Sequence, residues 1–335
     1  MNSNSKTHIC EKCADLVSIG GYYQTKDYFI TKNVAIKKIS GEAVQIDMPE
    51  LGEICTYEND VYSFDTEKKL IWHINLDTGE KSKLEFNQNT RPGHFFLSAL
   101  PYHRAEYYPQ CNSKYIIYMN DDNLWIIDLA TGKNIKLRDS DSEEIRVEHG
   151  TVLLKDEYVF FVSRILGKYD TGIYKYHIPT GKIAGLCALE GVLEGSEFKY
   201  NKTEALNYDE ILSELYEGKI YCMAYDEEEY TEKLYIIDLS NGKITEDEIY
   251  FECEPEEIEY MTVQDNVIYY YTQFGQFLKY DINTEVNTLL EKKSLFDMTY
   301  SSLYVVGDWI YYDDHDDNTH RISVYGGNHV VIERS

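Results

Sequence analysis

The sequence has little positive charge and no long apolar segment. It contains 32 Lys and Arg against 59 Asp and Glu, which gives a formal charge of -27. Nucleic-acid binders hold phosphates with Lys and Arg, so this balance argues against DNA or RNA, and it also argues against an anionic membrane surface. No run approaches the roughly 20 consecutive apolar residues of a membrane-spanning helix. No signal peptide is recognisable in the first residues, so we expect a cytoplasmic protein.

Several other features are also missing. The seven cysteines, at positions 10, 13, 55, 111, 187, 222 and 253, are odd in number and widely scattered. This usage fits a reducing compartment with thiols packed in a core better than a disulfide framework. The sequence contains no G-x-S-x-G, H-E-x-x-H, P-loop or G-x-G-x-x-G motif. These absences predict no cofactor and favour a protein that is not an enzyme, although a catalytic carboxylate pair could be hidden among the many acidic residues.

What the sequence does contain is a repeated turn. The strongest copies are LIWHINLDTGEK (70–81), NLWIIDLATGKN (123–134), GIYKYHIPTGKI (172–183) and KLYIIDLSNGKI (233–244), and weaker copies lie at 33–44, 276–287 and 320–331. The equivalent turn positions are spaced 38 to 61 residues apart and cover nearly the whole chain: Gly41, Gly79, Gly132, Gly181, Gly242, Glu285 and Gly327. Seven similar units of this length predict a repeat architecture.

Each unit has the plan of two consecutive β-hairpins. Apolar residues alternate up to the turn, as in a strand that leads into a tight turn and a return strand. A second hairpin precedes it, with turns at 25–27, 57–59, 111–113, 155–157, 216–218, 264–266 and 306–308. Four antiparallel strands per unit predict an all-β, seven-bladed β-propeller over residues 15–335, after an N-terminal segment at 1–14.

Two alternative folds are a set of β-sandwiches and a β-solenoid, but a solenoid has shorter coils and a sandwich has no reason to repeat one unit. The stretch 207–218, NYDEILSELYEG, has helical periodicity in isolation. The repeat register nevertheless predicts a strand in its second half, with a helical turn before it as the lesser possibility. The 32 tyrosines suit half-buried strands of this kind.

The units LIWHINLDTGE and DWIYYDDHDDNTHRISVYGG resemble the LRP1-like, YWTD-related β-propeller domain of unknown function found in bacterial proteins. The resemblance covers roughly residues 15–335 and consists of a strand of the type W-I-Y-Y followed by one of the type Y-x-I-x-x-x-G. It implies the propeller fold and a binding or scaffolding role, and it implies no particular substrate.

Acidic residues gather in the predicted loops between the second and third strands of each unit. The main clusters are Asp226, Glu227, Glu228 and Glu229 in one loop, and Asp313, Asp314, Asp316 and Asp317 in another. Such loops open on one face of a propeller, so this face would dock a basic partner or cations. The alternative is that acidic loops only keep the protein soluble and block pairing of strand edges. Calcium at 313–318 is a weaker option, because the regular carboxylate spacing of a calcium loop is absent.

One long interblade stretch, 86–111, is basic and aromatic in an otherwise acidic chain. Its candidate ligand-binding residues are Arg91, His94, His103, Arg104, Tyr107 and Tyr108. They would bind an anionic or aromatic ligand, or the stretch would only fill space between two blades. Cys10 and Cys13, with His8 nearby, form half of a zinc site at most, since a structural zinc needs four ligands.

Two functional hypotheses follow. The first is a non-catalytic scaffold, most simply a monomer, whose acidic face docks a protein partner with a basic surface. The second is a propeller enzyme or binding protein that acts on a carbohydrate or small anion at the mouth of the central channel. It would use His94, His103 and Arg104 together with loop carboxylates.

Overall fold

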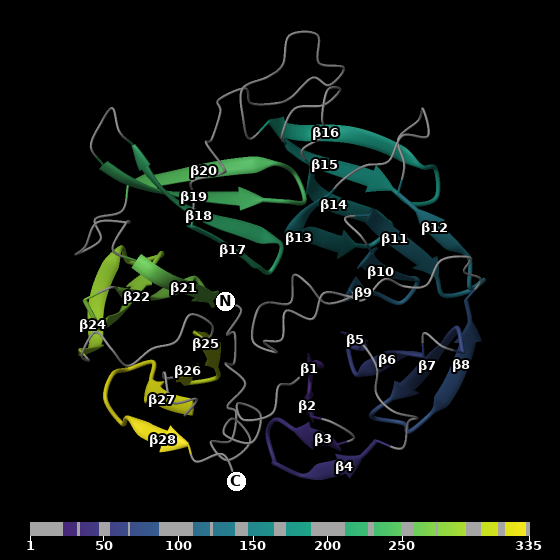
Figure 1. Cartoon of the computed structure of the whole chain (residues 1–335), viewed down its shortest axis with the longest axis horizontal. Helices are drawn as coiled ribbons and strands as arrows, with labels where there is room; N and C mark the ends of the chain where they lie inside the picture. The colour runs from purple at the N-terminus through teal and green to yellow at the C-terminus, as the bar shows by residue number, and fades with distance from the viewer. Residues whose placement is uncertain are drawn as a thin grey trace, which may run out of the picture. The chain divides into compact units, whose positions relative to one another are not determined.

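The computed structural model describes residues 23–31, 34–46, 54–65, 68–86, 110–120, 123–137, 147–163, 172–188, 212–226, 231–248, 258–272, 274–292, 303–313 and 319–332 (Figure 1). Within these ranges the chain forms strands and turns. No helix in them is long and apolar enough to cross a membrane.

The strands form seven sheets, and each sheet contains four antiparallel strands in chain order. We number the sheets as blades 1 to 7. Blade 1 consists of β1 (Tyr23–Gln24), β2 (Tyr28–Thr31), β3 (Val34–Lys37) and β4 (Ala43–Gln45). Blade 2 consists of β5 (Ile54–Tyr57), β6 (Asp60–Asp65), β7 (Leu70–Asn75) and β8 (Lys81–Glu85). Blade 3 consists of β9 (Gln110–Cys111), β10 (Tyr115–Asn120), β11 (Asn123–Asp128) and β12 (Asn134–Lys136).

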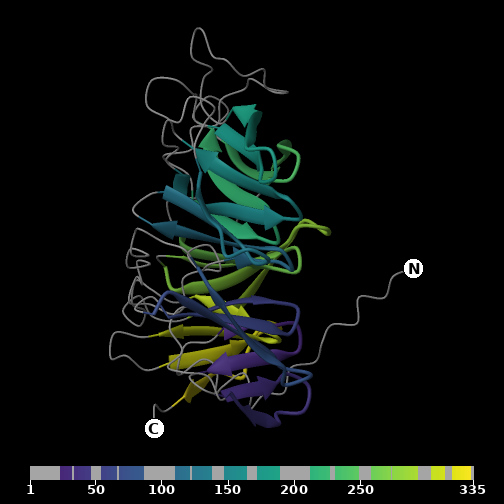
Figure 2. The same cartoon turned by 90° about the vertical axis from the view of Figure 1, so that its right-hand side faces the viewer.

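Blades 4 to 7 repeat this plan, and Figure 2 shows the same strands turned by 90°. Blade 4 consists of β13 (Val147–Lys155), β14 (Tyr158–Ser163), β15 (Gly172–His177) and β16 (Lys182–Ala188). Blade 5 consists of β17 (Leu212–Tyr216), β18 (Lys219–Asp226), β19 (Thr231–Asp238) and β20 (Lys243–Glu248). Blade 6 consists of β21 (Ile258–Gln264), β22 (Val267–Thr272), β23 (Gln276–Asp281) and β24 (Val286–Lys292). Blade 7 consists of β25 (Tyr304–Val306), β26 (Trp309–Asp313), β27 (Thr319–Ser323) and β28 (Val330–Ile332).

Seven consecutive four-stranded antiparallel sheets are the organisation of a seven-bladed β-propeller, so the predicted fold class is confirmed. The stretch that looked helical in isolation contains strand β17, as the repeat register predicted. Its second half forms a strand because the neighbouring strand β18 pairs with β17 along its whole length, and this pairing outweighs the local helical pattern.

The repeated turn positions explain how each sheet reverses between its third and fourth strands. All seven have positive φ: Gly41 71°, Gly79 72°, Gly132 68°, Gly181 67°, Gly242 69°, Glu285 58° and Gly327 71°. In blades 1 to 6 the N–H of this residue donates to the carbonyl four residues earlier, at 2.8 Å. Left-handed backbone is open to glycine without strain, which is why glycine occupies six of the seven positions.

The chain divides into two compact units, and each is described by itself. The first contains blades 1, 2, 6 and 7, except for the last residue of β8, and the second contains blades 3, 4 and 5. In the first unit, Ile30, Val61 and Ile74 belong to one core that blades 1 and 2 share. Phe277 and Ile322 belong to a second core that blades 6 and 7 share. The single domain over 15–335 stays a prediction.

The second unit is built in the same way. Ile126 of blade 3 packs in one cluster with Val159 of blade 4, and Phe160 of blade 4 packs in another with Ile237 of blade 5. Tyrosines provide much of the buried volume on the inner strands, as predicted: Tyr174, Tyr221, Tyr270, Tyr311 and Tyr312 are among the largest fully buried side chains.

Two of the scattered cysteines contribute to these cores. Cys55 on β5 and Cys187 on β16 are buried cysteines that form no disulfide, and Cys111 is a partly exposed one. Buried thiols outside any disulfide fit the prediction that these cysteines serve core packing.

Candidate functional site

The basic and aromatic stretch lies almost entirely outside the described residues. Arg91, His94, His103, Arg104, Tyr107 and Tyr108 all belong to 87–109, and only Phe86, Gln110 and Cys111 at its ends are described. Phe86 is buried. Cys10 and Cys13 also lie outside the described residues, so both site hypotheses stay predictions.

The ends of the two acidic loops are described. Strand β18 ends at Asp226, whose backbone pairs with Thr231 at the start of β19. Strand β26 ends at Asp313, whose backbone pairs with Thr319 at the start of β27. Glu227, Glu228, Glu229, Asp314, Asp316 and Asp317 lie outside the described residues. The pairings confirm that both acidic segments connect the second strand of a blade to the third.

At the opposite end of the strands, the first turns of blades 1 and 2 form a buried polar network. The Asn59 side chain accepts hydrogen bonds from Thr25 Oγ1 and from the Asp27 N–H, both at 3.0 Å. Its Nδ2 donates to Asp27 Oδ2 and to Asp77 Oδ2, both at 2.8 Å. Asn59 is 6% exposed, so one amide side chain satisfies the polar groups of two neighbouring turns.

Exposed ion pairs join turns at the same end of the blades. Lys26 Nζ lies 3.1 Å from Glu58 Oε2 between blades 1 and 2, and Lys114 Nζ lies 2.8 Å from Glu157 Oε1 between blades 3 and 4. The hydrogen bond to Glu58 raises the pKa of Lys26, and the hydrogen bond from Lys114 lowers the pKa of Glu157. Exposed pairs add little stability, but they balance charge along this end.

A buried lysine lies beside the Asn59 network. Lys38 Nζ donates to the Thr25 carbonyl at 2.7 Å and lies 5.1 Å from the centre of the Phe29 ring. The residue is 9% exposed, and burial lowers the pKa of its ammonium group to about 8. Desolvation therefore outweighs the attraction of the nearby Asp27 carboxylate.

A second polar cluster spans three strands of blade 2. His73 Nε2 lies 2.8 Å from Asp60 Oδ1 on β6, and His73 Nδ1 lies 3.0 Å from Ser82 Oγ on β8. Asn75 Nδ2 donates to the same Asp60 oxygen at 2.8 Å, and the ring of Tyr62 stacks on His73 with centroids 4.8 Å apart. These contacts hold His73 in one orientation and tie the outermost strand to the inner ones.

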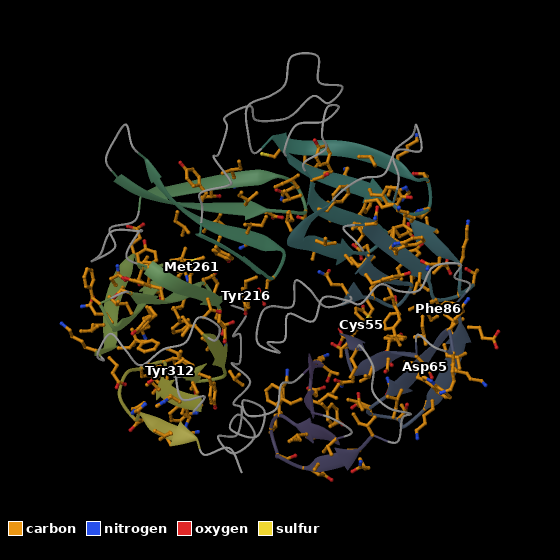
Figure 3. The ribbon with its side chains drawn as sticks, viewed as in Figure 1. Cys55, Asp65, Phe86, Tyr216, Met261 and Tyr312 are labelled. Atoms are coloured by element: carbon orange, nitrogen blue, oxygen red, sulfur yellow. The ribbon has the colours of Figure 1, made fainter. Side chains whose placement is uncertain are left out.

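A third cluster lies in blade 7, at the end of the strands where β26 leads into its acidic loop. Tyr312 is fully buried and His320 is 8% exposed, whereas His329 lies in the exposed turn between β27 and β28 (Figure 3 labels Tyr312). His320 Nδ1 lies 3.0 Å from His329 Nε2, and Tyr312 Oη lies 3.2 Å from the same nitrogen. Within the described ranges, no three His, Cys, Asp or Glu side chains gather to hold a metal ion.

Sequence reasoning singled out neither histidine cluster. The period-two alternation of a strand shows that His73 and Asn75, or Tyr312 and Ile310, share a face. It does not show which residues of the next strand lie beside them, because the register depends on the length of each turn. The pairings Tyr62↔His73 and Tyr312↔His320 supply this information.

No protein-family model and no curated protein matches the chain. One solved structure, from an analysis of two prolyl endopeptidases, is 13% identical over 94% of this chain and 49% of that chain, with a TM-score of 0.50. This chain thus spans about half the length of that enzyme. The designed Ika8 protein is 14% identical over 98% of this chain and 87% of that chain, with a TM-score of 0.48. BamB from Moraxella catarrhalis is 10% identical over 95% and 88%, with a TM-score of 0.41.

Identities this low show likeness of fold alone, and a propeller fold serves both enzymes and binding proteins. The predicted resemblance to the YWTD-related family is not confirmed, since no family model matches. The comparisons therefore leave this chain a seven-bladed β-propeller whose family is not assigned.

Proposed function

We propose that the protein is a non-catalytic interaction module that docks a partner with a basic surface. The docking surface is the acidic edge, which we define as the ends of the blades where second strands lead into third strands. Its main carboxylates are Asp226, Glu227, Glu228 and Glu229 in blade 5, and Asp313, Asp314, Asp316 and Asp317 in blade 7.

The observation that carries this proposal is the strand order. In an antiparallel blade, the connection from the second to the third strand lies at the end opposite to the first and last turns. The pairings of Asp226 with Thr231 and of Asp313 with Thr319 put both acidic segments in that position within their own blades. In each of these two blades, taken by itself, an acidic loop at this end suits a charge-selected docking surface.

The charges at the other end of the blades support the same assignment. There, described cations such as Lys26 and Lys114 already pair with the carboxylates of Glu58 and Glu157. The net charge of -27 therefore favours the acidic edge as the part of the surface that attracts a basic partner.

The rigidity of the blades would also help binding. Each blade is a four-stranded sheet, and shared apolar cores join blades 1 and 2, 3 and 4, 4 and 5, and 6 and 7. Loops presented on a rigid framework lose less conformational entropy when a partner binds. This arrangement resembles the way in which other scaffolds carry binding loops.

Affinity capture from native extract tests the proposal. The wild-type protein is compared with a triple variant of the acidic edge, Glu227→Gln, Glu228→Gln and Glu229→Gln. A matched control removes three carboxylates from the opposite turns, with Asp156→Asn, Glu217→Gln and Asp265→Asn. We expect a basic partner to be retained at low salt by the wild type and the control, and to be lost from the acidic-edge variant.

Salt supplies the second readout. Because charges across a docking surface are screened over a Debye length of about 8 Å at physiological ionic strength, retention should fall steadily as salt is raised. Equal retention by all three proteins, or retention that does not respond to salt, would rule out docking by the acidic edge.

A further inference from the structure

Three side chains of blade 7 bring their polar atoms to one point. His320 Nδ1 lies 3.0 Å from His329 Nε2, and Tyr312 Oη lies 3.2 Å from the same nitrogen. One imidazole nitrogen and one phenol oxygen thus lie within hydrogen-bond distance of His329 Nε2, and His329 is exposed to solvent.

The two imidazole rings lie end to end. Their planes differ by 10° and their centroids are 5.2 Å apart, which is close to the N···N distance plus one ring radius at each end. The rings are therefore nearly coplanar, and their facing nitrogens point toward each other rather than past each other.

The atoms that meet at His329 Nε2 are all able to offer a lone pair. A neutral imidazole carries a lone pair on one of its two nitrogens, and the choice of tautomer decides which one. A phenol oxygen keeps its lone pairs whether or not its hydrogen is donated. A cation that replaced the hydrogen bonds around His329 Nε2 would therefore be offered lone pairs by these three side chains.

The local fold holds the donors in place. Tyr312 and His320 are paired residues on β26 and β27, and their rings stack with centroids 4.9 Å apart at an angle of 8°. Tyr312 also packs on Phe277 of blade 6, with centroids 4.9 Å apart. Arg321, the next residue of β27, faces the other side of the sheet, where its guanidinium lies 4.1 Å from the centre of the Trp309 ring.

The position of His329 depends on an unusually long turn. Six residues separate β27 from β28, whereas four or five separate the third and fourth strands of the other blades. Asn328 adopts a left-handed conformation with φ 55° directly before the histidine. The extra length lets His329 reach back beside His320 on the same face of the sheet.

We propose that His320 Nδ1 and His329 Nε2 are ligands of a divalent transition metal of the zinc class, with the Tyr312 hydroxyl as a third donor. Imidazole nitrogen is a preferred ligand of Zn²⁺, Cu²⁺ and Ni²⁺, whereas Ca²⁺ and Mg²⁺ prefer oxygen. Two imidazoles bound to Zn²⁺ with tetrahedral geometry place their nitrogens about 3.3 Å apart. Zinc binding would therefore widen the gap between the facing nitrogens by about 0.3 Å, and it would turn both rings out of their end-to-end alignment so that each lone pair meets the ion. Water would complete the coordination.

Binding requires no oxidation or reduction. Each neutral imidazole presents its facing nitrogen as the lone-pair tautomer and carries its proton on the far nitrogen. The stretch from Asp313 to Asp317 between Tyr312 and His320 contributes four aspartates by sequence, and their negative charge would favour the approach of a cation.

Zinc titration of the full chain by calorimetry tests this proposal. The measurement is made in a Cys10→Ser, Cys13→Ser background, because those thiols are a separate candidate site. We expect one Zn²⁺ per chain, and at least a tenfold loss of affinity on His329→Ala. His177→Ala is the matched control, because His177 is a histidine of another blade whose Nδ1 lies 2.7 Å from Thr180 Oγ1. No zinc binding in this background, or equal binding by His329→Ala, would overturn the proposal.

Two further variants separate ligation from folding. His329 is exposed, so His329→Ala should leave the midpoint of urea unfolding unchanged. His320→Ala removes a buried stacked ring and can lower stability as well, so it serves only to confirm the loss of zinc affinity. Tyr312→Phe keeps the stack and removes the hydroxyl, and we expect a 10-fold to 100-fold loss of zinc affinity. Nitrogen NMR should show zinc-dependent shifts at His320 Nδ1 and His329 Nε2. Shifts at neither nitrogen would exclude them as ligands.

Discussion

Replacing Asn59 tests how strongly the polar network joins blades 1 and 2. The Asn59→Ala variant removes two accepted bonds, from Thr25 Oγ1 and the Asp27 N–H, and two donated bonds, to the carboxylates of Asp27 and Asp77. It also leaves the Asp27 N–H without this acceptor and the two carboxylates without the amide between them.

The magnitude follows from the type of each bond. A net contribution of about 1 kcal/mol is typical of a neutral hydrogen bond, and one to a charged group contributes about 1.5 to 3 kcal/mol. Asp77 is exposed and Asp27 is partly exposed, so the lower end applies to the charged pairs. We therefore expect Asn59→Ala to lower the free energy of unfolding by about 5 kcal/mol.

An isosteric variant separates packing from charge. Asn59→Asp keeps the size and the accepted bonds but adds a third carboxylate beside Asp27 and Asp77. Repulsion should raise the pKa of the new carboxyl above its unfolded value of about 3.9, so its stabilising protonated form is lost as the pH rises. Relative to wild type, this variant should be strongly destabilised at neutral pH and should recover below about pH 4.

Urea denaturation followed by circular dichroism measures both variants. Asn283→Ala, in the exposed turn between β23 and β24, is the control and should change stability by no more than about 0.5 kcal/mol. A loss of under about 1 kcal/mol for Asn59→Ala would refute the reasoning, because the network would then contribute no more than one ordinary hydrogen bond.

Three further changes probe titration and turn geometry. The pKa of Lys38 is about 8 in the folded protein, whereas its ordinary value is 10.5. Between these two pH values the unfolded chain binds more protons than the folded one, so the free energy of unfolding should rise as the pH is raised from about 8 to 10.5. Lys38→Met should remove this rise in urea denaturation, and an unchanged pH profile would contradict the assignment. Burial, followed by the charge of Asp265, raises the pKa of Tyr269, so stability should fall as the pH rises above about 10. Tyr269→Phe should lose less stability than the wild type at alkaline pH, and fewer of its tyrosines should ionise late when tyrosinate absorbance is followed during a pH titration. An equal loss of stability in the variant and the wild type would contradict the assignment to Tyr269. Glu285→Gly should raise the free energy of unfolding by about 0.5 to 1 kcal/mol, because φ is 58° at this position and glycine adopts it without strain. Gly79→Ala should lower it by about 1 kcal/mol through backbone strain alone, because no atom lies within 4 Å of the added carbon. Urea denaturation should therefore give stability changes of opposite sign for these two variants, and changes of the same sign would contradict the argument from φ.

The repeat turns show why the fold could be predicted from sequence. The need for a left-handed residue at Gly79 or Gly132 is local, since it depends on a few neighbouring residues and their hydrogen bonds. Alternation of apolar residues in the flanking strands is local as well. Even Glu285, which breaks the glycine pattern, keeps a positive φ of 58° and the hydrogen bond to the carbonyl four residues earlier, that of Asp281, because the register of the flanking strands imposes the turn.

The polar clusters could not be predicted in this way. His320 and His329 are nine residues apart, a spacing that has no meaning until the long turn of blade 7 is known. Asn59 joins residues 32 to 34 positions away in the sequence, so its role depends on how blade 1 packs against blade 2. Acidic residues were easier to assign, because a loop's place between two strands follows from strand order alone.

The two proposals for this protein make separable demands on the chain. Docking by the acidic edge depends on its carboxylates, so His329→Ala, which removes no carboxylate, should leave partner capture and its salt dependence unchanged. Zinc binding depends on two nitrogens of blade 7, so the glutamine substitutions at Glu227, Glu228 and Glu229 in blade 5 should leave zinc stoichiometry at one per chain. If His329→Ala also abolished partner capture, the metal would belong to the docking surface itself, and excess zinc or a chelator would then have to change capture by the wild type.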